Sequence, residues 1–179
     1  MAPSRPPLLV STPQGLYCPA GDFHIDPMRK VSRAVITHAH ADHARRGHAH
    51  YLCAAEGKEV LQARLGRVSM QTLAYGEVLE LHGVRLSLHP AGHVLGSAQV
   101  RVEHCGEVWV VSGDYFCSPW GDTQPGIAPF EPLRCDCFIT ESTFAVPLYR
   151  WRPQAEVFAE IDAWWRDNAA AGRPSALAS

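Results

Sequence analysis

The densest group of chemically active side chains is the run His38-Ala-His40-Ala-Asp42-His43, which holds three imidazoles and one carboxylate. Two imidazoles separated by one small residue can project to the same side at the end of a strand. Neutral imidazole and carboxylate are the donor set of zinc, and the absence of cysteine from the run disfavours an iron–sulfur cluster or a zinc ribbon. A lone histidine would more simply be a surface residue, but four donors this close together predict a metal site.

Two later segments can bring further donors to this site. His93 lies in a loop with Gly92 before it and Gly96 after it, and Asp114 follows the apolar stretch 108–111 and a Ser-Gly pair. A strand end can deliver a carboxylate while glycine permits a close approach of the backbone. The alternative for His93 is an ordinary turn histidine.

A short β-rich segment, residues 33–37, leads directly into the histidine run and predicts a buried strand. Around it the pattern predicts strands at 8–10 and 51–53 and a strand, turn and strand over 16–25. A helix is predicted over 55–65, with Val60, Leu61 and Leu65 on one face.

Alternating apolar residues then predict two β-hairpins, one over 78–88 with a His82-Gly83 turn and one over 98–111 with a turn at 104–106. Residues 121–132 read as a loop and 137–140 as a further strand. The clearest predicted helix is 153–171, with Phe158, Ile161 and Trp165 on one stripe. Residues 173–179 resemble the beginning of another strand.

The composition indicates one globular unit. The chain has 179 residues, of which 46% are hydrophobic and 19% charged, which excludes a disordered, collagen-like or coiled-coil chain. Its longest apolar run, 51–55, is far short of the ~18 residues of a membrane-spanning helix. With no signal-peptide core either, the expected location is the cytoplasm.

The six cysteines are scattered, and Cys135 and Cys137 form the only close pair, so reduced thiols are expected rather than a disulfide framework. The formal net charge of −2 gives no indication of a nucleic-acid partner.

Taken together, the motif from His38 to His43, the later His93 in His89-Pro-Ala-Gly-His93, and Asp114 in Val111-Ser-Gly-Asp114-Tyr resemble the metallo-β-lactamase fold, a superfamily of mostly dinuclear metal hydrolases. The resemblance implies two Zn²⁺ ions. It implies that the first ion is held by His38, His40 and His93, the second by Asp42 and His43, and that Asp114 bridges both. The family's last histidine has no counterpart after His104, so the second site is incomplete in this chain.

The stretch Phe138-Ile-Thr-Glu141-Ser-Thr-Phe144 resembles the first motif of the β-CASP branch of that superfamily, which acts on nucleic acids. The resemblance implies that Glu141 assists protonation of the leaving group beside a histidine from an inserted cap domain. By itself, a glutamate at a strand end followed by Ser-Thr could equally cap the next turn.

Longer stretches, 15–27, 109–115 and 130–144, are similar to bacterial DNA ligase-associated exonucleases, which are related to mRNA 3′-end processing nucleases. This implies an α/β fold: the N-terminal half of an αββα sandwich in residues 1–150 and the start of a β-CASP cap in 151–179. Asp26 matches an early aspartate of the family and is expected to orient the metal ligands.

The remaining histidines, His48, His50, His82, His89 and His104, are expected at the surface or in supporting positions. Tryptophans can stack on bases. Trp109 and Trp165 are instead expected in the core, which leaves Trp120, Trp151 and Trp164 for stacking.

The resulting hypothesis is a zinc-dependent nuclease that cleaves DNA from an end, in DNA repair, with Asp42, Asp114 and Glu141 as catalytic residues and an ATP-dependent DNA ligase as a possible partner. An RNA-processing endonuclease of the same branch would share every ligand. A small-molecule thioesterase or lactamase of the same fold should lack the Glu141 motif. An inactive fragment or binding module is the third alternative, and this chain alone is expected to have little activity because the last ligand is missing.

Overall fold

The computed structural model describes residues 6–118, 121, 123–146 and 148–176. The chain forms two compact units. The first contains the described residues as far as Cys117 together with 123–141, and the second contains those from 118 to 121 and from 142 onwards. Each unit is described by itself. Whether residues 151–179 begin a cap region stays a prediction.

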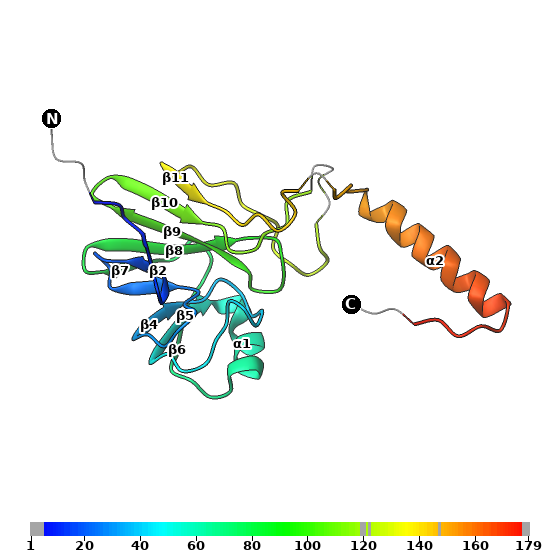
Figure 1. Cartoon of the computed structure of the whole chain (residues 1–179), viewed down its shortest axis with the longest axis horizontal. Coiled ribbons are helices and arrows are strands. Elements are labelled where there is room, and N and C mark those ends of the chain that lie inside the picture. Colours follow the sequence, from blue (N-terminus) through cyan, green and yellow to red (C-terminus); the bar gives the residue numbers. More distant parts are fainter. Residues whose placement is uncertain (1–5, 119–120, 122, 147, 177–179) are drawn as a thin grey trace. The chain divides into compact units, whose positions relative to one another are not determined.

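The first unit contains two β-sheets (Figure 1). In the six-stranded sheet, β1 to β3 are antiparallel and β3 to β6 are parallel. Its strands follow the order of the sequence: β1 (Val10–Thr12), β2 (Gly15–Cys18), β3 (Phe23–Ile25), β4 (Arg33–Val35), β5 (His50–Ala54) and β6 (Met70–Leu73). The parallel arrangement places the ends of β4 and β5 at one edge, so residues that follow these strands gather there.

The five-stranded sheet has the order β11-β10-β9-β8-β7, antiparallel except for the parallel pair β10 and β11. Its strands are β7 (Val78–Leu81), β8 (Val84–Pro90), β9 (Ala98–His104), β10 (Glu107–Val111) and β11 (Cys137–Ile139). Both predicted hairpins are confirmed.

Both hairpin turns have two residues in the left-handed region. His82 and Gly83 have φ of 52° and 81°, and Cys105 and Gly106 have the same two values. Positive φ at both central residues is the signature of a type I′ turn. The second turn is shorter than the predicted 104–106, because His104 still pairs with Glu107.

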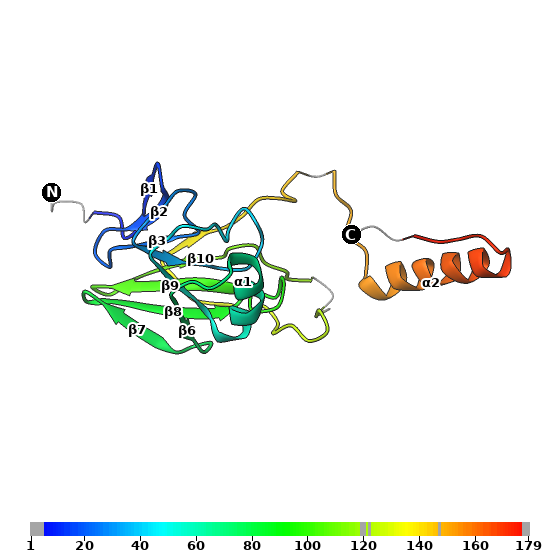
Figure 2. The ribbon, with the colours of Figure 1, turned by 90° about the horizontal axis from the view of Figure 1, so that it is seen from below.

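The main core lies between the two sheets (Figure 2). Along β5, Leu52 and Ala54 point into this core, whereas Tyr51 and Cys53 point to the opposite face. There they pack against α1 (Lys58–Leu65), which follows a 3₁₀ turn, η1 (Ala55–Gly57). This period of two, on a strand with both faces covered, explains why β5 is apolar from Tyr51 to Ala54. The layers are therefore helix, sheet and sheet, which confirms the α/β class.

The outer face of the five-stranded sheet is covered in part by an irregular segment. Gln99 is fully buried, and its Nε2 donates to the carbonyl oxygens of Pro90, at 2.9 Å, and Glu131, at 2.7 Å. These bonds hold the segment around Glu131 against the end of β9. In the described part of this unit no helix packs on that face.

The second unit contains α2 (Gln154–Ala170), which Pro153 precedes. Arg152 reaches Glu160 at 2.8 Å and Glu156 at 3.4 Å. The prediction that Trp165 is a core residue is wrong within this unit, since its side chain is 55% exposed, and Phe158 on the same stripe is also exposed. Trp109 does pack against the core between the sheets, as predicted.

Several local predictions differ from the structure. Val60 is exposed although it was expected on the packed face of α1, because the apolar contacts of this short helix come from Leu61 and Leu65 alone. His48 is buried rather than at the surface, since its Nδ1 accepts a hydrogen bond from the Val31 amide. The strand predicted at 8–10 lies at Val10–Thr12 instead.

Two further differences concern strands. Residues Met70–Leu73 form β6, for which no element was predicted; this edge strand gains its hydrogen bonds from β5. Residues 173–176 contain no strand.

Trp120 lies outside the described residues. None of the six cysteines forms a disulfide, and none of the described helices has the length and apolar character needed to span a bilayer.

A close approach of two glycines fixes the loop after β8 against the start of α1. A Cβ atom built on Gly96, which has a φ of 74°, would lie 2.1 Å from the Cα of Gly57. The Gly96→Ala variant is therefore expected to lose more unfolding free energy than Gly76→Ala, by about 2 kcal/mol or more. Gly76 is the matched control, because its φ is 80° but a Cβ there would meet nothing within 4 Å. Urea unfolding measures both, and equal losses would contradict the close approach.

Candidate metal centre

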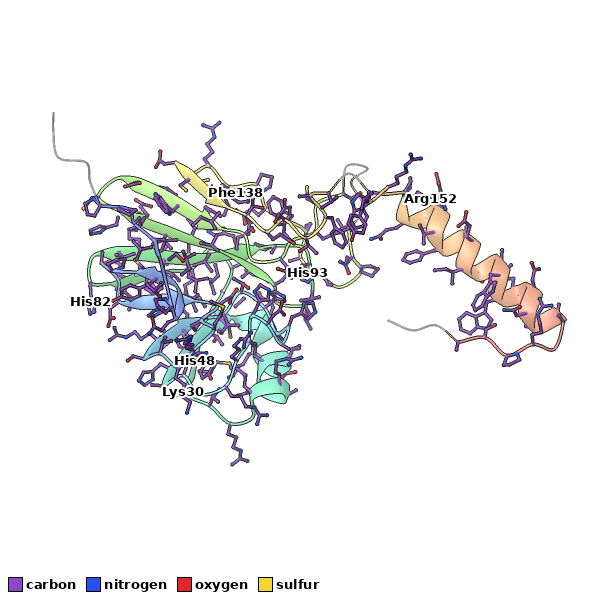
Figure 3. The ribbon with its side chains drawn as sticks, in the orientation of Figure 1. Lys30, His48, His82, His93, Phe138 and Arg152 are labelled. Atoms are coloured by element: carbon purple, nitrogen blue, oxygen red, sulfur yellow. The ribbon has the colours of Figure 1, made fainter. Side chains whose placement is uncertain are left out.

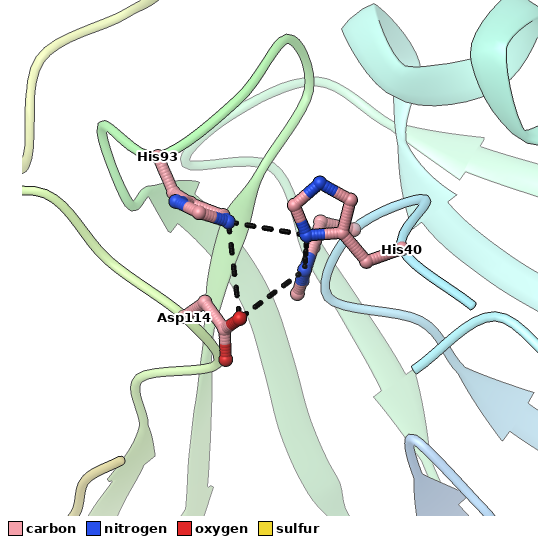
Figure 4. Close-up of side chains that lie close together, drawn as sticks. His40, His93 and Asp114 are labelled. Carbon is pink, nitrogen blue, oxygen red and sulfur yellow. Dashed lines mark hydrogen bonds and ion pairs between the residues drawn. The ribbon is translucent and has the colours of Figure 1, made fainter. Parts of the chain in front are cut away.

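Four donor atoms from three distant segments converge at one end of the first unit. They belong to His38, His40, His93 and Asp114 and lie within 4.8 Å of one another (Figure 4). His40 Nδ1 lies 2.9 Å from His38 Nε2 and 3.2 Å from His93 Nε2. Asp114 Oδ2 lies 3.6 Å from His38 Nε2 and 3.8 Å from His93 Nε2.

This spacing fits a tetrahedral metal ion. Zinc bound at about 2.0–2.1 Å to nitrogen or oxygen places neighbouring donor atoms about 3.3 Å apart. The four observed separations, from 2.9 to 3.8 Å, bracket that value. Three imidazoles and a carboxylate are also donors that zinc accepts. The residues present therefore fit the metal that the sequence resemblance implies.

A hydrogen-bond chain beneath the site sets the orientation of His38. The Thr37 hydroxyl donates to Asp26 Oδ2 at 2.6 Å, so its oxygen is left to accept from His38 Nδ1, which lies 3.1 Å away. With the proton on Nδ1, the lone pair of His38 Nε2 faces the other donors. Such outer contacts fix the tautomer of a metal-binding histidine.

The environment of His38 keeps its ring neutral. The side chain is fully buried, and burial together with the neighbouring imidazoles of His43, His40 and His93 lowers the pKa of His38 to about 2. Burial also lowers the pKa of His93, although the Asp114 carboxylate opposes this. Since only a neutral imidazole can bind a metal ion, both rings are ready to do so at neutral pH.

A second group of donors lies beside the first. His43 Nδ1 and Asp26 Oδ2 are 2.8 Å apart, while His43 Nε2 lies 3.2 Å from Asp114 Oδ1 and 3.6 Å from Asp42 Oδ2. Burial alone would lower the pKa of His43, but the hydrogen bond to Asp26 and the charges of Asp26, Asp114 and Asp42 outweigh it and raise the pKa. A positive charge is therefore favoured between these carboxylates, either a proton or a metal ion.

The loop that carries His93 is held by Ser97. The buried Ser97 hydroxyl accepts hydrogen bonds from the amides of His93, at 3.0 Å, and Val94, at 3.2 Å. The His93 carbonyl in turn accepts from Gln124 Nε2 at 2.9 Å. The Ala98 amide donates to the Thr37 carbonyl at 2.8 Å, which joins this loop to the strand end before His38. These contacts fix the position of the third imidazole.

Asp114 reaches the cluster because a glycine lets two strand ends approach. Gly113 has a φ of 57°, and a Cβ atom there would lie 2.8 Å from the Cβ of Thr37. Burial raises the pKa of Asp114, the His43 ring opposes this, and the Glu141 carboxylate adds to it. A cation at the site would offset the cost of holding this carboxylate ionised.

Glu141 follows β11, next to the segment that carries Asp114. Its Oε1 accepts a hydrogen bond from the Tyr115 amide at 2.9 Å, and its own amide donates to Ser112 Oγ at 3.4 Å. The charge of Glu141 acts on both His93 and Asp114. The carboxylate is thus anchored at the edge of the metal centre.

Every predicted site residue lies in this region. The closest group consists of His38, His40, His93 and Asp114. Asp42 and His43 lie beside it, Asp26 contacts His43 and accepts a hydrogen bond from Thr37, and Glu141 lies at its edge. Gly113 belongs to the Ser-Gly pair that was expected to permit a close approach before Asp114, but the supporting residues Thr37 and Ser97 were not found from the sequence. Thr37 directly precedes a predicted ligand, which was the available signal, whereas nothing in the sequence marks the two hydrogen bonds of Ser97.

The Thr37 hydroxyl should matter for metal binding beyond its effect on stability. Thr37→Val is expected to weaken zinc affinity about 10- to 100-fold, because the tautomer and orientation of His38 lose their support. Thr37→Ser should retain most of the affinity, and Thr72→Val, a similar change on β6, should leave it within about threefold. Competition with a chromophoric chelator below the unfolding temperature measures all three, and wild-type affinity in Thr37→Val would exclude this role.

Comparison with known proteins finds no matching family model but several sequence relatives. The chain is 33% identical over 151 residues to a protein of Opitutus terrae named "Probable DNA ligase", an alignment that covers 82% of this chain and 14% of that protein. It is 32% identical over 87 residues to the endoribonuclease YSH1 of Kluyveromyces lactis, which covers 49% of this chain and 11% of that enzyme.

Among solved structures, a metallo-β-lactamase of Cronobacter sakazakii has a TM-score of 0.43 and 17% identity, over 62% of this chain and 56% of that one. The alignments cover 14% of the Opitutus protein and 11% of YSH1, so the chain spans only a small part of the length of its curated sequence relatives. The endoribonuclease relatives, with the order of the motifs at His38, His93 and Asp114, support the resemblance to metallo-β-lactamase-fold nucleases.

Proposed function

We propose that this chain supplies the metal centre of a nuclease that hydrolyses phosphodiester bonds in DNA. One observation carries the proposal: the convergence of His38, His40, His93 and Asp114 within 4.8 Å, in a chain whose sequence relatives include a named endoribonuclease and a named DNA ligase. The donor set suits a hydrolytic metal ion, and the relatives suggest nucleic acid as the substrate.

In this proposal the chain's residues would hold two zinc ions. His38, His40 and His93 would hold the first, Asp42 and His43 the second, and Asp114 would contact both. The positions of the two Asp114 oxygens support this, since Oδ2 faces His38 and Oδ1 faces His43. When bound, a pair of divalent ions neutralises phosphate oxygens and makes water nucleophilic at neutral pH.

The side chains of the chain would then orient the reactants and move protons. The carboxylates of Asp42 and Asp114 would accept hydrogen bonds from the attacking water and align it with the phosphorus atom. As the P–O bond to the leaving oxygen breaks, that oxygen needs a proton. Glu141, anchored by the Tyr115 amide, is positioned to support its delivery at the edge of the centre.

DNA is the preferred substrate because the alignment with the Opitutus protein covers most of this chain. We propose that the protein digests DNA from an end in the cytoplasm, in repair, together with an ATP-dependent DNA ligase. The second candidate is endonucleolytic cleavage of RNA. It is favoured by the endoribonuclease relatives, although their alignment covers about half of the chain.

The metal centre is tested by comparing Asp114→Ala with the wild type in the protein that contains this chain. Loss of the shared carboxylate should remove at least one zinc per molecule, measured by mass spectrometry of the metal content, and reduce cleavage about 1,000-fold or more. Full turnover by this variant would refute the mechanism.

End-labelled linear and circular DNA, with RNA of the same sequence, would separate the two candidates. Cleavage restricted to linear DNA supports the first candidate, and cleavage of RNA at internal sites supports the second.

Glu141 should act on turnover and not on metal content. Glu141→Gln keeps the size of the side chain but removes its proton-carrying carboxyl, so kcat is expected to fall about 100- to 10,000-fold with zinc stoichiometry unchanged. Glu131→Gln, on an exposed carboxylate that pairs with His89, is the control. Loss of zinc in Glu141→Gln would instead assign this residue a structural role.

A further inference from the structure

The basic residues of this acidic chain are concentrated in one part of it. Residues 29–67 hold eight Lys and Arg against three Asp and Glu, a formal charge of +5, whereas the whole chain carries −2. This segment contains β4, the histidine run, β5 and α1. The excess positive charge therefore surrounds the elements that carry the first metal ligands.

Seven of these eight cations form no ion pair in the part of the chain that the structure describes; the exception is Arg33, which pairs with Asp22 at 2.8 Å. Elsewhere in the first unit, Arg85 and Arg101 both pair with Glu103, at 3.2 and 2.7 Å. Four of the seven are Lys30, Arg45, Arg46 and Arg64. All but Arg64 belong to loops, and all four are exposed.

The four side chains belong to one surface, which we call the basic patch: Lys30, Arg45, Arg46 and Arg64. The stem of Lys30 lies over Gly47, where an added Cβ atom would be 2.9 Å from the Lys30 Cε. Arg46 Nη2 donates to the Arg64 carbonyl at 2.8 Å, and Arg45 Nε lies 3.4 Å from the Asp42 carbonyl. Three segments thus bring their cations to the loop that follows His43.

The basic patch leads away from the metal centre. It begins at Arg45, next to Asp42, and reaches Arg64 in the last turn of α1 and Lys30 shortly before the start of β4. In the side-chain view, Lys30 lies at the lower edge of the unit and His93 at the end of the strands (Figure 3). A linear polyanion that enters the centre can therefore remain in contact with this surface.

Unpaired cations gathered on one surface repel one another, and a phosphate chain is a partner that relieves this repulsion. Arginine presents several N–H donors in a plane that matches phosphate oxygens, and Arg46 uses only one of its five in the bond to Arg64. We infer that the basic patch binds the sugar–phosphate backbone of the substrate strand beside the metal centre. This inference rests on the proposed nuclease function.

Binding without metal isolates this surface. The probes are fluorescein-labelled single strands, (dT)20 and (U)20, titrated with the full chain in EDTA between 50 and 200 mM KCl and followed by anisotropy. Lys30→Gln with Arg64→Gln keeps every described hydrogen bond of the patch, since Arg46 donates to the backbone of Arg64. Arg134→Gln is the control for Arg64→Gln, because it removes another exposed arginine without an ion pair in the described residues.

The double variant should bind at least about fivefold more weakly at 50 mM KCl, and its plot of log affinity against log salt should be less steep by about 1.4, or about 0.7 for each lost phosphate contact. Both probes should respond alike, because phosphates are common to DNA and RNA. Arg64→Gln should weaken binding, and Arg134→Gln should change it less than twofold.

Equal losses in Arg64→Gln and Arg134→Gln, or no binding by the wild type, would overturn the inference. The outcome is separate from that of the nuclease proposal. Because the assay contains no metal, binding through the patch survives even if no cleavage is found. Conversely, a double variant that binds like the wild type refutes the patch while leaving the Asp114→Ala test of the metal centre unaffected.

Discussion

The structure depends on one electrostatic constraint: imidazole lone pairs and carboxylate oxygens are held a few ångströms apart in a partly buried place. His38 is fully buried and its pKa lies at about 2, so it cannot relieve the crowding by taking up a proton. On its far side His43 is drawn towards the charged form by three carboxylates. Such an arrangement is costly without a cation, and the donor spacing suits a divalent metal ion.

The two sheets supply the rigidity that this crowding requires. Each ligand segment lies just beyond a strand: the histidine run after β4, His93 after β8 and Asp114 after β10. Two close contacts, Gly113 against the Thr37 side chain and Gly96 against the Gly57 backbone, hold these ends together. Asp26 then accepts hydrogen bonds from the Thr37 hydroxyl and the His43 ring, and Ser97 accepts one from the His93 amide, which hold the ligand segments in place. The strands thus carry the side chains, and the glycines bring the strands close enough.

Positive charge is concentrated in the segment that carries the histidine run. The chain has a net negative charge, which by itself would repel a polyanion weakly, yet residues 29–67, which contain the metal-binding loop and α1, carry a formal charge of +5. Local potential near a site governs the encounter with a charged substrate more than the total charge does. Under the proposed function, the metal centre would hold the scissile phosphate and the basic patch would hold its neighbours along the strand.

The sequence alone determined the hairpins, the strand before His38 and the identity of every donor, because alternation and short ligand spacing are local properties that survive without a fold. Trp165 and Val60 were misjudged since burial depends on which partner covers an apolar stripe, and β6 was missed because an edge strand takes its hydrogen bonds from a neighbour. Only the tertiary structure revealed Thr37, Ser97 and the pairing of cations. Those contacts join residues far apart in the chain, or backbone groups that no residue pattern records, and their energies exist only once the two sheets have packed.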